Sequence, residues 1–396
     1  MNKKIHILRE KLKDYNIDGY IVPKNDDYFT EYSKINRLKI ISNFTGSAGL
    51  AVILKNKNYL FTDGRYTIQS QIESGNNFKI ISYEKIINCD LFKNLTLGID
   101  PKLITYDQAK KFFLKKNKIK FISNNLIDDI ESDKIKDNFP FFRLKKNIVG
   151  ESFTSKINKI SKFLKKNKSD HLFVSAPENV AWILNIRGKD GPNSPIPNCR
   201  LIISKNKNFY LISSIKKSKN LIKEKIIRAK ELVKINDFSK KVLQLKGNSF
   251  IIDGKSCSIY FEDIIKSKFK ITKREDPTYL LKAIKNKTEI KNMINAHIID
   301  GVALTKFIYW IKNINKKKIN EVQAQNKLEQ FRKMNKNYLY PSFDTIAGSG
   351  ENGAIVHYRA KKENCRTIRK KDIFLCDSGG QYKYGTTDVT RTICFS

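Results

Sequence analysis

Apolar and polar positions alternate along the N-terminal third of the chain in the order of an α/β domain. Residues 4–15 place apolar side chains three and four positions apart, the spacing of an amphipathic helix. The short apolar run at 20–22 predicts a buried strand. Two further runs, 50–54 and 59–62, flank a polar turn and predict two more strands, and a helix is expected to begin near Tyr66.

The same order of elements then recurs. The first domain is predicted at residues 1–148 and a second at 151–275. The second begins with an amphipathic helix after Ser152 and continues with strands predicted at 171–174, 201–203, 210–212 and 250–253. Since helix, strand, paired strands and helix follow one another in both segments, we expect one shared fold, a mixed sheet flanked by helices.

A third domain is predicted at residues 277–396. Apolar residues from 280 to 313 follow helical spacing and predict one long helix. The segments 341–358 and 373–393 are rich in Gly, Thr and aromatic residues, which is typical of strands joined by tight turns. The fold class is therefore α/β, with an α+β third domain.

Composition places the chain among folded cytoplasmic proteins. Hydrophobic residues make up 40% of the 396 residues, enough for sizeable cores. No apolar run approaches the ~20 residues of a membrane span. The N-terminus mixes apolar and charged side chains, whereas a secretory signal needs a continuous apolar stretch.

The formal net charge of +38 raises the question of a nucleic-acid partner. Only 13 of the 77 basic residues are Arg, and the Lys residues are scattered along the whole chain. Phosphate-binding surfaces concentrate charge on one face and favour Arg for bidentate contacts. Because Lys here accompanies abundant Asn and Ile, we interpret the charge as a bias in composition and expect no nucleic-acid partner.

The six cysteines indicate neither a zinc site nor a disulfide framework. They stand far apart, without a C-x-x-C pair, at positions 89, 199, 257, 365, 376 and 394. In an intracellular chain they are expected to stay reduced. Cys376 adjoins an acidic segment but is expected to be a small core residue.

Two aspartates near the end of the sequence are the strongest candidates for chemistry. Asp377 and Asp388 lie 11 positions apart, so a hairpin turning between Tyr382 and Lys383 would set them opposite each other, with Cβ atoms ~5 Å apart. Carboxylates that close repel unless they are protonated or bridged by cations, and two divalent metals would relieve the repulsion. The alternative is a turn-capping Asp and an unrelated surface Asp.

The run from Asp377 to Thr392, DSGGQYKYGTTDVTRT, resembles the metal-site signature of aminopeptidase P, the Xaa-Pro aminopeptidases of the pita-bread metallopeptidase group. Other segments resemble the same family in the same order: 42–49, 61–66, 181–188, 282–290, 341–346 and 352–358. The resemblance covers essentially the whole chain. It implies two creatinase-N-terminal-like α/β domains followed by an incomplete pita-bread catalytic domain.

The resemblance also implies roles for single residues. Asp377 and Asp388 would be metal ligands, with Asp388 bridging two divalent ions, for which Mn²⁺ is the usual metal of the family. His357 matches the histidine beside the scissile bond, which holds substrate or helps to move a proton. Phe343 and Tyr358 would line the pocket for proline, although aromatic residues in strands are core residues by default.

In the middle domain, Arg187 is a candidate substrate-binding residue. It would reach a neighbouring active site together with Asp190, or the two residues would form an exposed loop pair. The resemblance further implies a homodimer when the protein is intact.

One departure from the family pattern concerns the remaining ligands. Pita-bread peptidases place one His and two Glu after the Asp pair, whereas the eight residues after Asp388 contain neither His nor Glu. The other histidines, His6, His171 and His297, fall in segments that match non-ligand regions. We therefore expect a C-terminally truncated chain whose two-metal centre is incomplete and inactive.

The function implied is release of the N-terminal residue from peptides with proline in second position. Two alternatives stay open. The first is a non-catalytic binding protein of the same fold that uses its basic surface. The second is a prolidase-like dipeptidase, which fold alone does not exclude.

Overall fold

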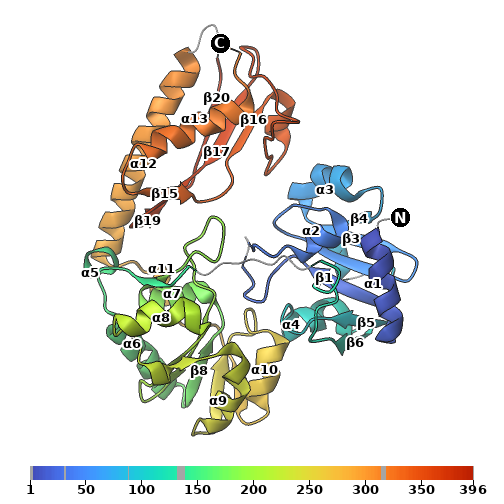
Figure 1. Cartoon of the computed structure of the whole chain (residues 1–396), viewed down its shortest axis with the longest axis vertical. Helices are drawn as coiled ribbons and strands as arrows, with labels where there is room; N and C mark the ends of the chain where they lie inside the picture. Colours follow the sequence, from blue (N-terminus) through green and yellow to red (C-terminus); the bar gives the residue numbers. More distant parts are fainter. Residues whose placement is uncertain (1–2, 31–32, 88, 132–138, 314–317, 396) are drawn as a thin grey trace. The chain divides into compact units, whose positions relative to one another are not determined.

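The computed structural model describes residues 3–30, 33–87, 89–131, 139–313 and 318–395 (Figure 1). They form two compact units. Unit 1 comprises Met1–Leu144 and Glu151–Ile284, and unit 2 comprises Lys145–Gly150 and Lys285–Ser396. Each unit is built around its own hydrophobic cores.

Unit 1 contains two six-stranded sheets whose strands follow one another in the same spatial order. The first has the order β4-β3-β2-β1-β5-β6 and the second β12-β11-β10-β8-β13-β14. The strands of the first are β1 Gly19–Pro23, β2 Leu50–Leu54, β3 Asn58–Thr62, β4 Lys79–Ser82, β5 Thr96–Ile99 and β6 Lys118–Phe121. Those of the second are β8 His171–Val174, β10 Arg200–Ser204, β11 Phe209–Ile212, β12 Leu232–Val233, β13 Ser249–Ile252 and β14 Lys270–Lys273.

The two sheets also share their strand directions. In both, the central strand pairs in parallel with one neighbour (β1 with β5, β8 with β13) and antiparallel with the other (β1 with β2, β8 with β10). The outer pairs β3–β4 and β11–β12 are parallel, as are β5–β6 and β13–β14. The predicted repeat of one mixed-sheet fold is therefore confirmed.

The repeat extends to a polar turn after the fifth strand of each sheet. Asp100 follows β5 and Asp253 follows β13, and each carboxylate accepts a hydrogen bond of 2.9 Å from the backbone N–H two residues further on, that of Lys102 or Lys255. Both carboxylates are buried. This bond closes the turn, because the side chain satisfies an amide that the turn would otherwise leave unpaired.

Helices cover both faces of the sheets in unit 1 (Figure 1). Those of the first domain are α1 Lys3–Asp14, α2 Arg37–Ser42, α3 Thr67–Ser74 and α4 Tyr106–Ala109. Those of the second are α6 Phe153–Lys166, α7 Pro177–Leu184, α8 Ile215–Lys223, α9 Phe238–Gln244, α10 Ile259–Lys266 and α11 Thr278–Ala283. A small ladder joins β7 Phe142–Arg143 to β9 Ile186–Arg187.

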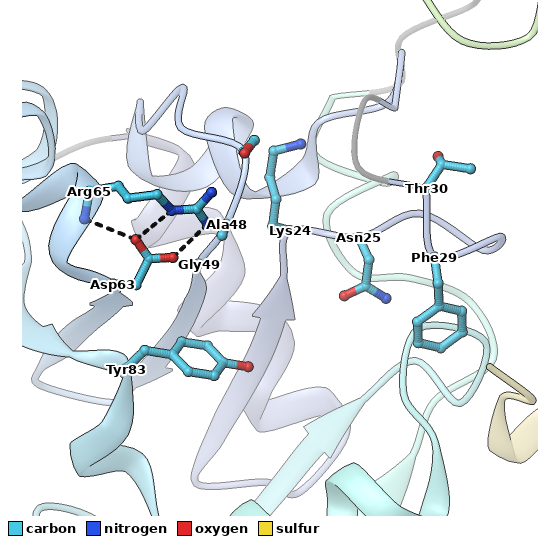
Figure 2. A pocket seen from close by; sticks show the side chains of 10 residues that line it. Lys24, Asn25, Phe29, Thr30, Ala48, Gly49, Asp63, Arg65 and Tyr83 are labelled. Atoms are coloured by element: carbon cyan, nitrogen blue, oxygen red, sulfur yellow. Dashed lines mark hydrogen bonds and ion pairs between the residues drawn. The ribbon is translucent and has the colours of Figure 1, made fainter. Parts of the chain in front are cut away.

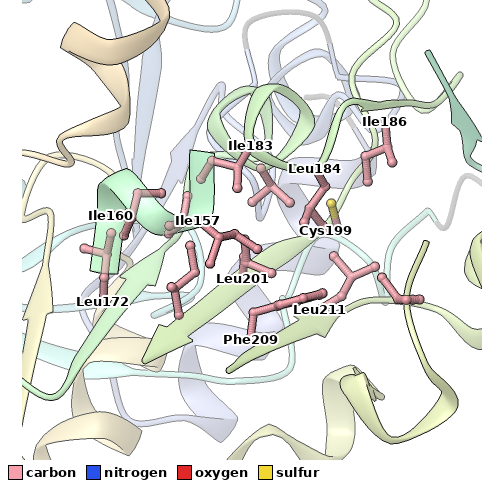
Figure 3. Close-up of a cluster of buried hydrophobic side chains, with 14 of the residues drawn as sticks. Ile157, Ile160, Leu172, Ile183, Leu184, Ile186, Cys199, Leu201, Phe209 and Leu211 are labelled. Atoms are coloured by element: carbon pink, nitrogen blue, oxygen red, sulfur yellow. The ribbon is translucent and has the colours of Figure 1, made fainter. Parts of the chain in front are cut away.

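One core of the second domain illustrates how the sequence pattern becomes packing (Figure 3). The amphipathic face of α6 places Ile157 and Ile160 against Leu172 of β8 and Leu201 of β10. All four side chains are almost fully buried. The three-and-four spacing of the helix and the apolar runs of the strands therefore meet in one cluster.

Unit 2 packs two helices on a hairpin that spans two small sheets. Its helices are α5 Lys146–Val149, α12 Lys287–Asn313 and α13 Glu321–Lys333. The strands are β15 Tyr338–Pro341, β16 Ile346–Ser349, β17 Phe374–Ser378, β18 Gly380–Tyr382, β19 Gly385–Thr386 and β20 Val389–Ile393. One sheet has the order β15-β18-β19 and the other β16-β17-β20.

The long helix predicted from 280 to 313 is wrong as one element, because the structure breaks it at 284–286 into α11 and α12. Asn286 caps the second helix: its side-chain oxygen accepts from the backbone N–H groups of Thr288 and Glu289, both at 3.0 Å. The Glu289 carboxylate in turn accepts from Asn286 N at 2.9 Å. This reciprocal capping box starts a new helix where apolar spacing alone indicates continuity.

The apolar stripe of α12 is only partly buried. Leu304 and Phe307 lie in the core of unit 2, whereas Ile290, Ile294 and Ile298 are exposed. Helical spacing therefore predicted helical structure over 287–313 but not which of its apolar residues face the core.

Lysines and cysteines follow the expectations from composition. Exposed lysines occur in both domains of unit 1 and in unit 2. Examples are Lys55, Lys159 and Lys361. All six cysteines carry free thiols. None of the helices in the described part of the chain is both long and apolar enough to cross a membrane.

Candidate functional site

The hairpin that carries the two aspartates forms as predicted, but it turns one residue later. β18 pairs with β19 through Tyr382 and Gly385, so the two loop residues are Lys383 and Tyr384. Further from the turn, β17 pairs with β20, and Asp377 stands opposite Thr390. The predicted direct opposition of Asp377 and Asp388 is therefore wrong.

The later turn offsets the two aspartates by two residues, which keeps them on the same face. Side chains along a strand alternate between faces with a period of two. Asp388 lies two positions before Thr390, so its side chain belongs to the face that carries Asp377 and becomes its diagonal neighbour. Asp377 is partly exposed and Asp388 is exposed, so this face is open to solvent.

A bend at Gly379 makes room for this arrangement. The strands are interrupted at Gly379 on one arm of the hairpin and at 387–388 on the other. A Cβ atom at Gly379 would lie 2.0 Å from the carbonyl oxygen of Thr387 and 2.2 Å from Ser342 Oγ. Only glycine fits there. Ser342 holds the bend by donating from its backbone N–H to Gly379 O (3.1 Å) and from Oγ to Thr387 O (2.8 Å).

The two carboxylates influence each other electrostatically. The pKa of Asp388 is raised above its ordinary value, first because the carboxyl loses part of its hydration and second because Asp377 carries a negative charge. Asp377 accepts a hydrogen bond of 2.7 Å from Thr390 Oγ1. This open face therefore favours a bound cation, which would relieve the repulsion between the two groups.

The donor set shows how far these residues fit a metal pair. Carboxylate oxygens suit Mn²⁺, Mg²⁺ or Co²⁺, and Asp377 and Asp388 supply them. In the described ranges, however, no group of three or more His, Cys, Asp or Glu side chains is placed to hold a metal ion. The hairpin therefore fits two carboxylate ligands of a metal pair and does not by itself enclose one.

His357 lies in a turn rather than a strand. Its φ angle is +58°, in the left-handed region that few residues other than glycine adopt. It follows a 3₁₀ turn at Gly350–Ala354 and immediately precedes the buried Tyr358. The strained backbone is a feature often found at functional positions.

Tyr358 is a core residue whose hydroxyl binds a buried carboxylate. Its ring packs with Ile346 and Ala360, and its hydroxyl donates to Glu321 Oε2 at 2.8 Å. Burial, and then Glu321, raise the pKa of the phenol. Phe343 is half-buried in the bend after β15. The structure thus places the hydroxyl of Tyr358 in the protein interior.

Sequence reasoning missed Glu321, which organises the loop that carries His357. Its fully buried carboxylate accepts from Ser349 N (2.7 Å), Asn352 Nδ2 (3.1 Å) and Arg366 N (2.9 Å), besides Tyr358. The sequence offered one signal for Glu321: it directly follows Asn320, the capping residue of α13. A glutamate at that position indicates the start of a helix and does not indicate a buried carboxylate.

Arg187 and Asp190 lie in unit 1. Arg187 is partly buried at the end of β9, where its guanidinium donates to the carbonyl oxygen of Ile186 at 2.9 Å. Asp190 is buried, accepts from Asn198 N at 2.6 Å, and is ion-paired with Lys217. The alternative of an exposed loop pair is therefore wrong for Asp190.

The remaining candidates are structural. Cys376 is buried in the core of unit 2, and burial raises the pKa of its thiol to about 12, so it is a core residue as predicted. His171 is buried between two rings and hydrogen-bonded to Ser204 and to Lys246 O. His297 is on the surface of α12, and its Nδ1 contacts Met293 O.

Two segments of the first domain that carry family-like sequence meet at one pocket. Residues 47–49 and the pair Asp63 and Arg65 line a pocket of about 360 Å³ together with Lys24 and Tyr83 (Figure 2). Arg65 donates to Asp63 through Nε (3.0 Å) and through Nη2 (2.7 Å). This ion pair is therefore neutralised within the pocket lining.

Comparisons with known proteins cover all three predicted domains. Residues 4–128 match the model of the creatinase/prolidase N-terminal domain, and residues 133–289 match a second model with the same description. Residues 291–396 match the model of metallopeptidase family M24.

Curated relatives match along nearly the entire chain. It is 34% identical to the "Probable Xaa-Pro aminopeptidase P" of Paracoccidioides brasiliensis (strain Pb03) over 98% of this chain and 68% of the relative. It is 34% identical to "Xaa-Pro aminopeptidase ApepP" of Drosophila melanogaster over 98% of this chain and 67% of that protein. For the relative in Laccaria bicolor, 33% identical, the chain spans 63% of its length.

One solved structure has the same fold over the entire chain. The X-prolyl aminopeptidase from Caenorhabditis elegans, described as a cytosolic enzyme with a di-nuclear active site, matches with a TM-score of 0.90 and 24% identity. The match covers 100% of this chain and 70% of that one. The expected fold, two creatinase-like domains and a pita-bread-type domain, is thereby confirmed.

Proposed function

The chain belongs to the aminopeptidase P family of Xaa-Pro aminopeptidases. From this membership we propose that the chain is part of a metal-dependent aminopeptidase. The reaction is release of the N-terminal residue from peptides with proline in second position. The Asp377–Asp388 hairpin would be the part of the active site that holds metal. Because the chain spans about two thirds of the length of these relatives, activity, substrate and partners are proposed for the whole enzyme.

The observation that carries this proposal is the placement of the two aspartates. Asp377 and Asp388 share one solvent-open face, and the pKa of Asp388 is raised, first by partial loss of hydration and then by the charge of Asp377. A structural role does not explain the pair, since like charges placed together destabilise a hairpin. A surface-binding protein of the same fold would have no need for them.

Two divalent ions fit the donor chemistry, and we propose Mn²⁺ because carboxylate oxygens suit it. Asp377 and Asp388 would hold them. When bound, such ions supply Lewis-acid polarisation of a carbonyl and activation of water. The one His and two Glu that the family adds to this pair are not found after Asp388 in residues 389–396.

The remaining residues would act on the substrate directly. His357, in its strained turn, would hold the peptide near the scissile bond or move a proton. Phe343 and the ring of Tyr358 would contact proline, while the Tyr358 hydroxyl stays on Glu321. Arg187 would contact substrate from the middle domain. We further propose that the whole enzyme is a homodimer in the cytoplasm. The alternative activity is that of a prolidase-like dipeptidase.

The test is to determine the full reading frame of the gene and to assay peptide hydrolysis by its product. We expect the gene's full product to supply one His and two Glu after Asp388, and to hydrolyse a proline-second tripeptide in the presence of Mn²⁺. The variants Asp377→Asn and Asp388→Asn should abolish turnover. Asp344→Asn, at an exposed carboxylate of the same unit, is the matched control. A full product that has these ligands but leaves the peptide intact would contradict the proposal.

A further inference from the structure

A buried ionic network lies behind the hairpin, on the side away from Asp377. Arg332 of α13 donates to Asp300 of α12 through Nε (2.7 Å) and Nη2 (3.1 Å). Tyr382 Oη donates at 2.7 Å to Asp300 Oδ1, the oxygen that also accepts from Arg332 Nε. Arg332 Nη2 donates in addition to Ser378 Oγ at 3.1 Å. Four side chains from two helices and two strands therefore share one set of hydrogen bonds.

The network is enclosed in the protein. The side chains of Arg332 and Asp300 are 2% and 1% exposed, and Ser378 and Tyr382 are buried as well. Removing two charges from water costs several kcal/mol per ion, so a buried pair is retained only where its geometry and hydrogen bonds compensate. Replacing a buried ion pair by apolar residues of similar volume is often neutral or stabilising, so stability alone does not account for the pair. Its hydrogen bonds also set the positions of the groups that it contacts.

The network joins the two sides of the Gly379 bend. Ser378 is the last residue of β17 and adjoins Asp377, whereas Tyr382 ends β18 beyond the bend. The Arg332–Asp300 pair contacts both, so it fixes the angle between the two halves of this hairpin arm. Since Asp388 lies on the other arm opposite Gly379, this angle decides where its carboxylate sits relative to Asp377.

We propose that Arg332, Asp300, Ser378 and Tyr382 form a positioning unit that fixes the spacing of the Asp377 and Asp388 carboxylates for a bound metal pair. The unit acts through the backbone of the bend and does not contact the metal. The metal part of this inference rests on the ligand assignment under the proposed function, whereas the hold on the bend does not.

The chain offers a matched pair of variants to test the unit. Tyr382→Phe removes the hydroxyl that binds Asp300 and keeps the ring. Tyr338→Phe removes a hydroxyl from the adjacent ring, whose centroid lies 5.7 Å from that of Tyr382. The Tyr338 hydroxyl is buried and has no hydrogen-bond partner among the described residues, so its loss should leave the bend unchanged. Ser378→Ala is a second variant that removes a different bond of the unit.

Two measurements on residues 1–396 separate positioning from folding. Hydrogen exchange of peptides spanning 378–388 reports opening of the bend, because Thr387 N and Gly380 N bond across it. Mn²⁺ affinity, followed by the electron paramagnetic resonance signal of the free ion, reports carboxylate spacing. We expect about fivefold faster exchange in Tyr382→Phe and in Ser378→Ala, the loss of one net hydrogen bond. Mn²⁺ affinity should fall up to ~10-fold, while Tyr338→Phe matches the wild type.

The outcomes distinguish this inference from the proposed function. Equal exchange rates in Tyr382→Phe and Tyr338→Phe would overturn the inference, whatever the metal result. Faster exchange with unchanged Mn²⁺ affinity would also overturn it, because the unit would then be structural only. A wild-type chain that binds no Mn²⁺, together with the expected exchange rates, would overturn the metal part of this inference and leave the unit's hold on the bend established. The metal assignment of the proposed function is decided separately, by the assay of the full product.

Discussion

Asp377 pairs across the hairpin with Thr390, whose hydroxyl donates a hydrogen bond of 2.7 Å to the Asp377 carboxylate. The direct cross-strand partner of this candidate ligand is therefore a neutral donor, and the second carboxylate is its diagonal neighbour. The hydrogen bond engages one oxygen of Asp377, Oδ1. A threonine in this place orients the ligand without adding charge.

The first prediction concerns this bond. Thr390→Val removes the hydroxyl while keeping a β-branched side chain, so we expect the free energy of unfolding of unit 2 to fall by about 0.5–1.5 kcal/mol. Urea unfolding followed by Trp310 fluorescence in a Trp182→Phe background measures it, because Trp310 is then the one tryptophan and lies in unit 2.

Thr392→Val is the control for this prediction, because Thr392 is an exposed residue of the same strand and stands opposite Leu375. Valine should be tolerated there. If both variants lost the same stability, the Thr390–Asp377 bond would not be the cause.

A second prediction concerns Glu321. Its carboxylate accepts hydrogen bonds from two backbone N–H groups, from Asn352 and from Tyr358 in the protein interior. Glu321→Gln keeps the shape but turns an acceptor-only group into one that also donates, so donor would face donor. We expect unit 2 to lose about 2–4 kcal/mol of stability, measured by the same unfolding assay.

The control lies on the same helix. Glu329 is a partly exposed partner of the exposed Lys333, and Glu329→Gln should change the stability of unit 2 by less than about 1 kcal/mol. A Glu321→Gln variant as stable as this control would show that the buried network does not depend on the charge.

The third prediction is a pH dependence in unit 1. An ion pair with Lys205, followed by hydrogen bonds from Asn248 and Ser249, holds the pKa of Asp170 well below its usual range. A carboxyl whose pKa is lowered on folding stabilises the folded state above its unfolded pKa of about 3.9, and this contribution is lost as the pH falls toward the lower folded value.

Asp170→Asn should therefore lower the free energy of unfolding of unit 1 by roughly 1–2 kcal/mol near pH 7, mainly through the lost hydrogen bonds. The ion pair contributes little to this value, because Lys205 is exposed and solvent screens its charge. The difference from wild type should shrink below about pH 4. Trp182 fluorescence in a Trp310→Phe background follows unit 1. Asp237→Asn, at an exposed carboxylate of the same domain, is the control. A difference that stayed constant from neutral to acidic pH would contradict the assignment.

The fourth prediction concerns residues 1–396 by themselves. Asp377 and Asp388 offer at most four oxygens to two ions that would each take roughly five or six ligands. Even the loss of outer-shell partners lowers metal affinity roughly 10–100-fold. We therefore expect the purified chain, given excess Mn²⁺, to leave a proline-second tripeptide uncleaved.

Turnover that disappears in Asp388→Ala would refute this expectation. It would mean that a second chain, or a side chain outside the expected ligand set, completes the metal centre. Turnover that persists in Asp388→Ala would point instead to a contaminating peptidase in the preparation.

The sequence by itself determined the elements and their repetition. Buried strands such as 171–174 and 50–54 are local apolar runs, and β8 and β2 have those bounds. A local pattern suffices because each strand buries its own side chains. The family-like run around Asp377 likewise needed no structure to be recognised, since it depends on residue types and spacing alone.

The shared face of Asp377 and Asp388 was also within reach of the sequence. Asp388 lies two positions before Thr390, and side chains alternate between faces with a period of two. A shift of the turn by one residue therefore changed the pairing but not the face. The register itself depended on Ser342 and on the close contact at Gly379, which no local pattern contains.

Only the tertiary structure decided the roles of the buried polar residues. Asp300 occupies a core position of α12 between Ala296 and Leu304, and its partners Arg332 and Tyr382 are 32 and 82 residues away along the chain. Glu321 meets donors up to 45 residues distant. From the local sequence alone, a charged residue in a helix is expected to be exposed to solvent. Only the fold shows that distant residues bind it in the interior. These groups are stable inside the protein only because distant segments bring hydrogen bonds to them.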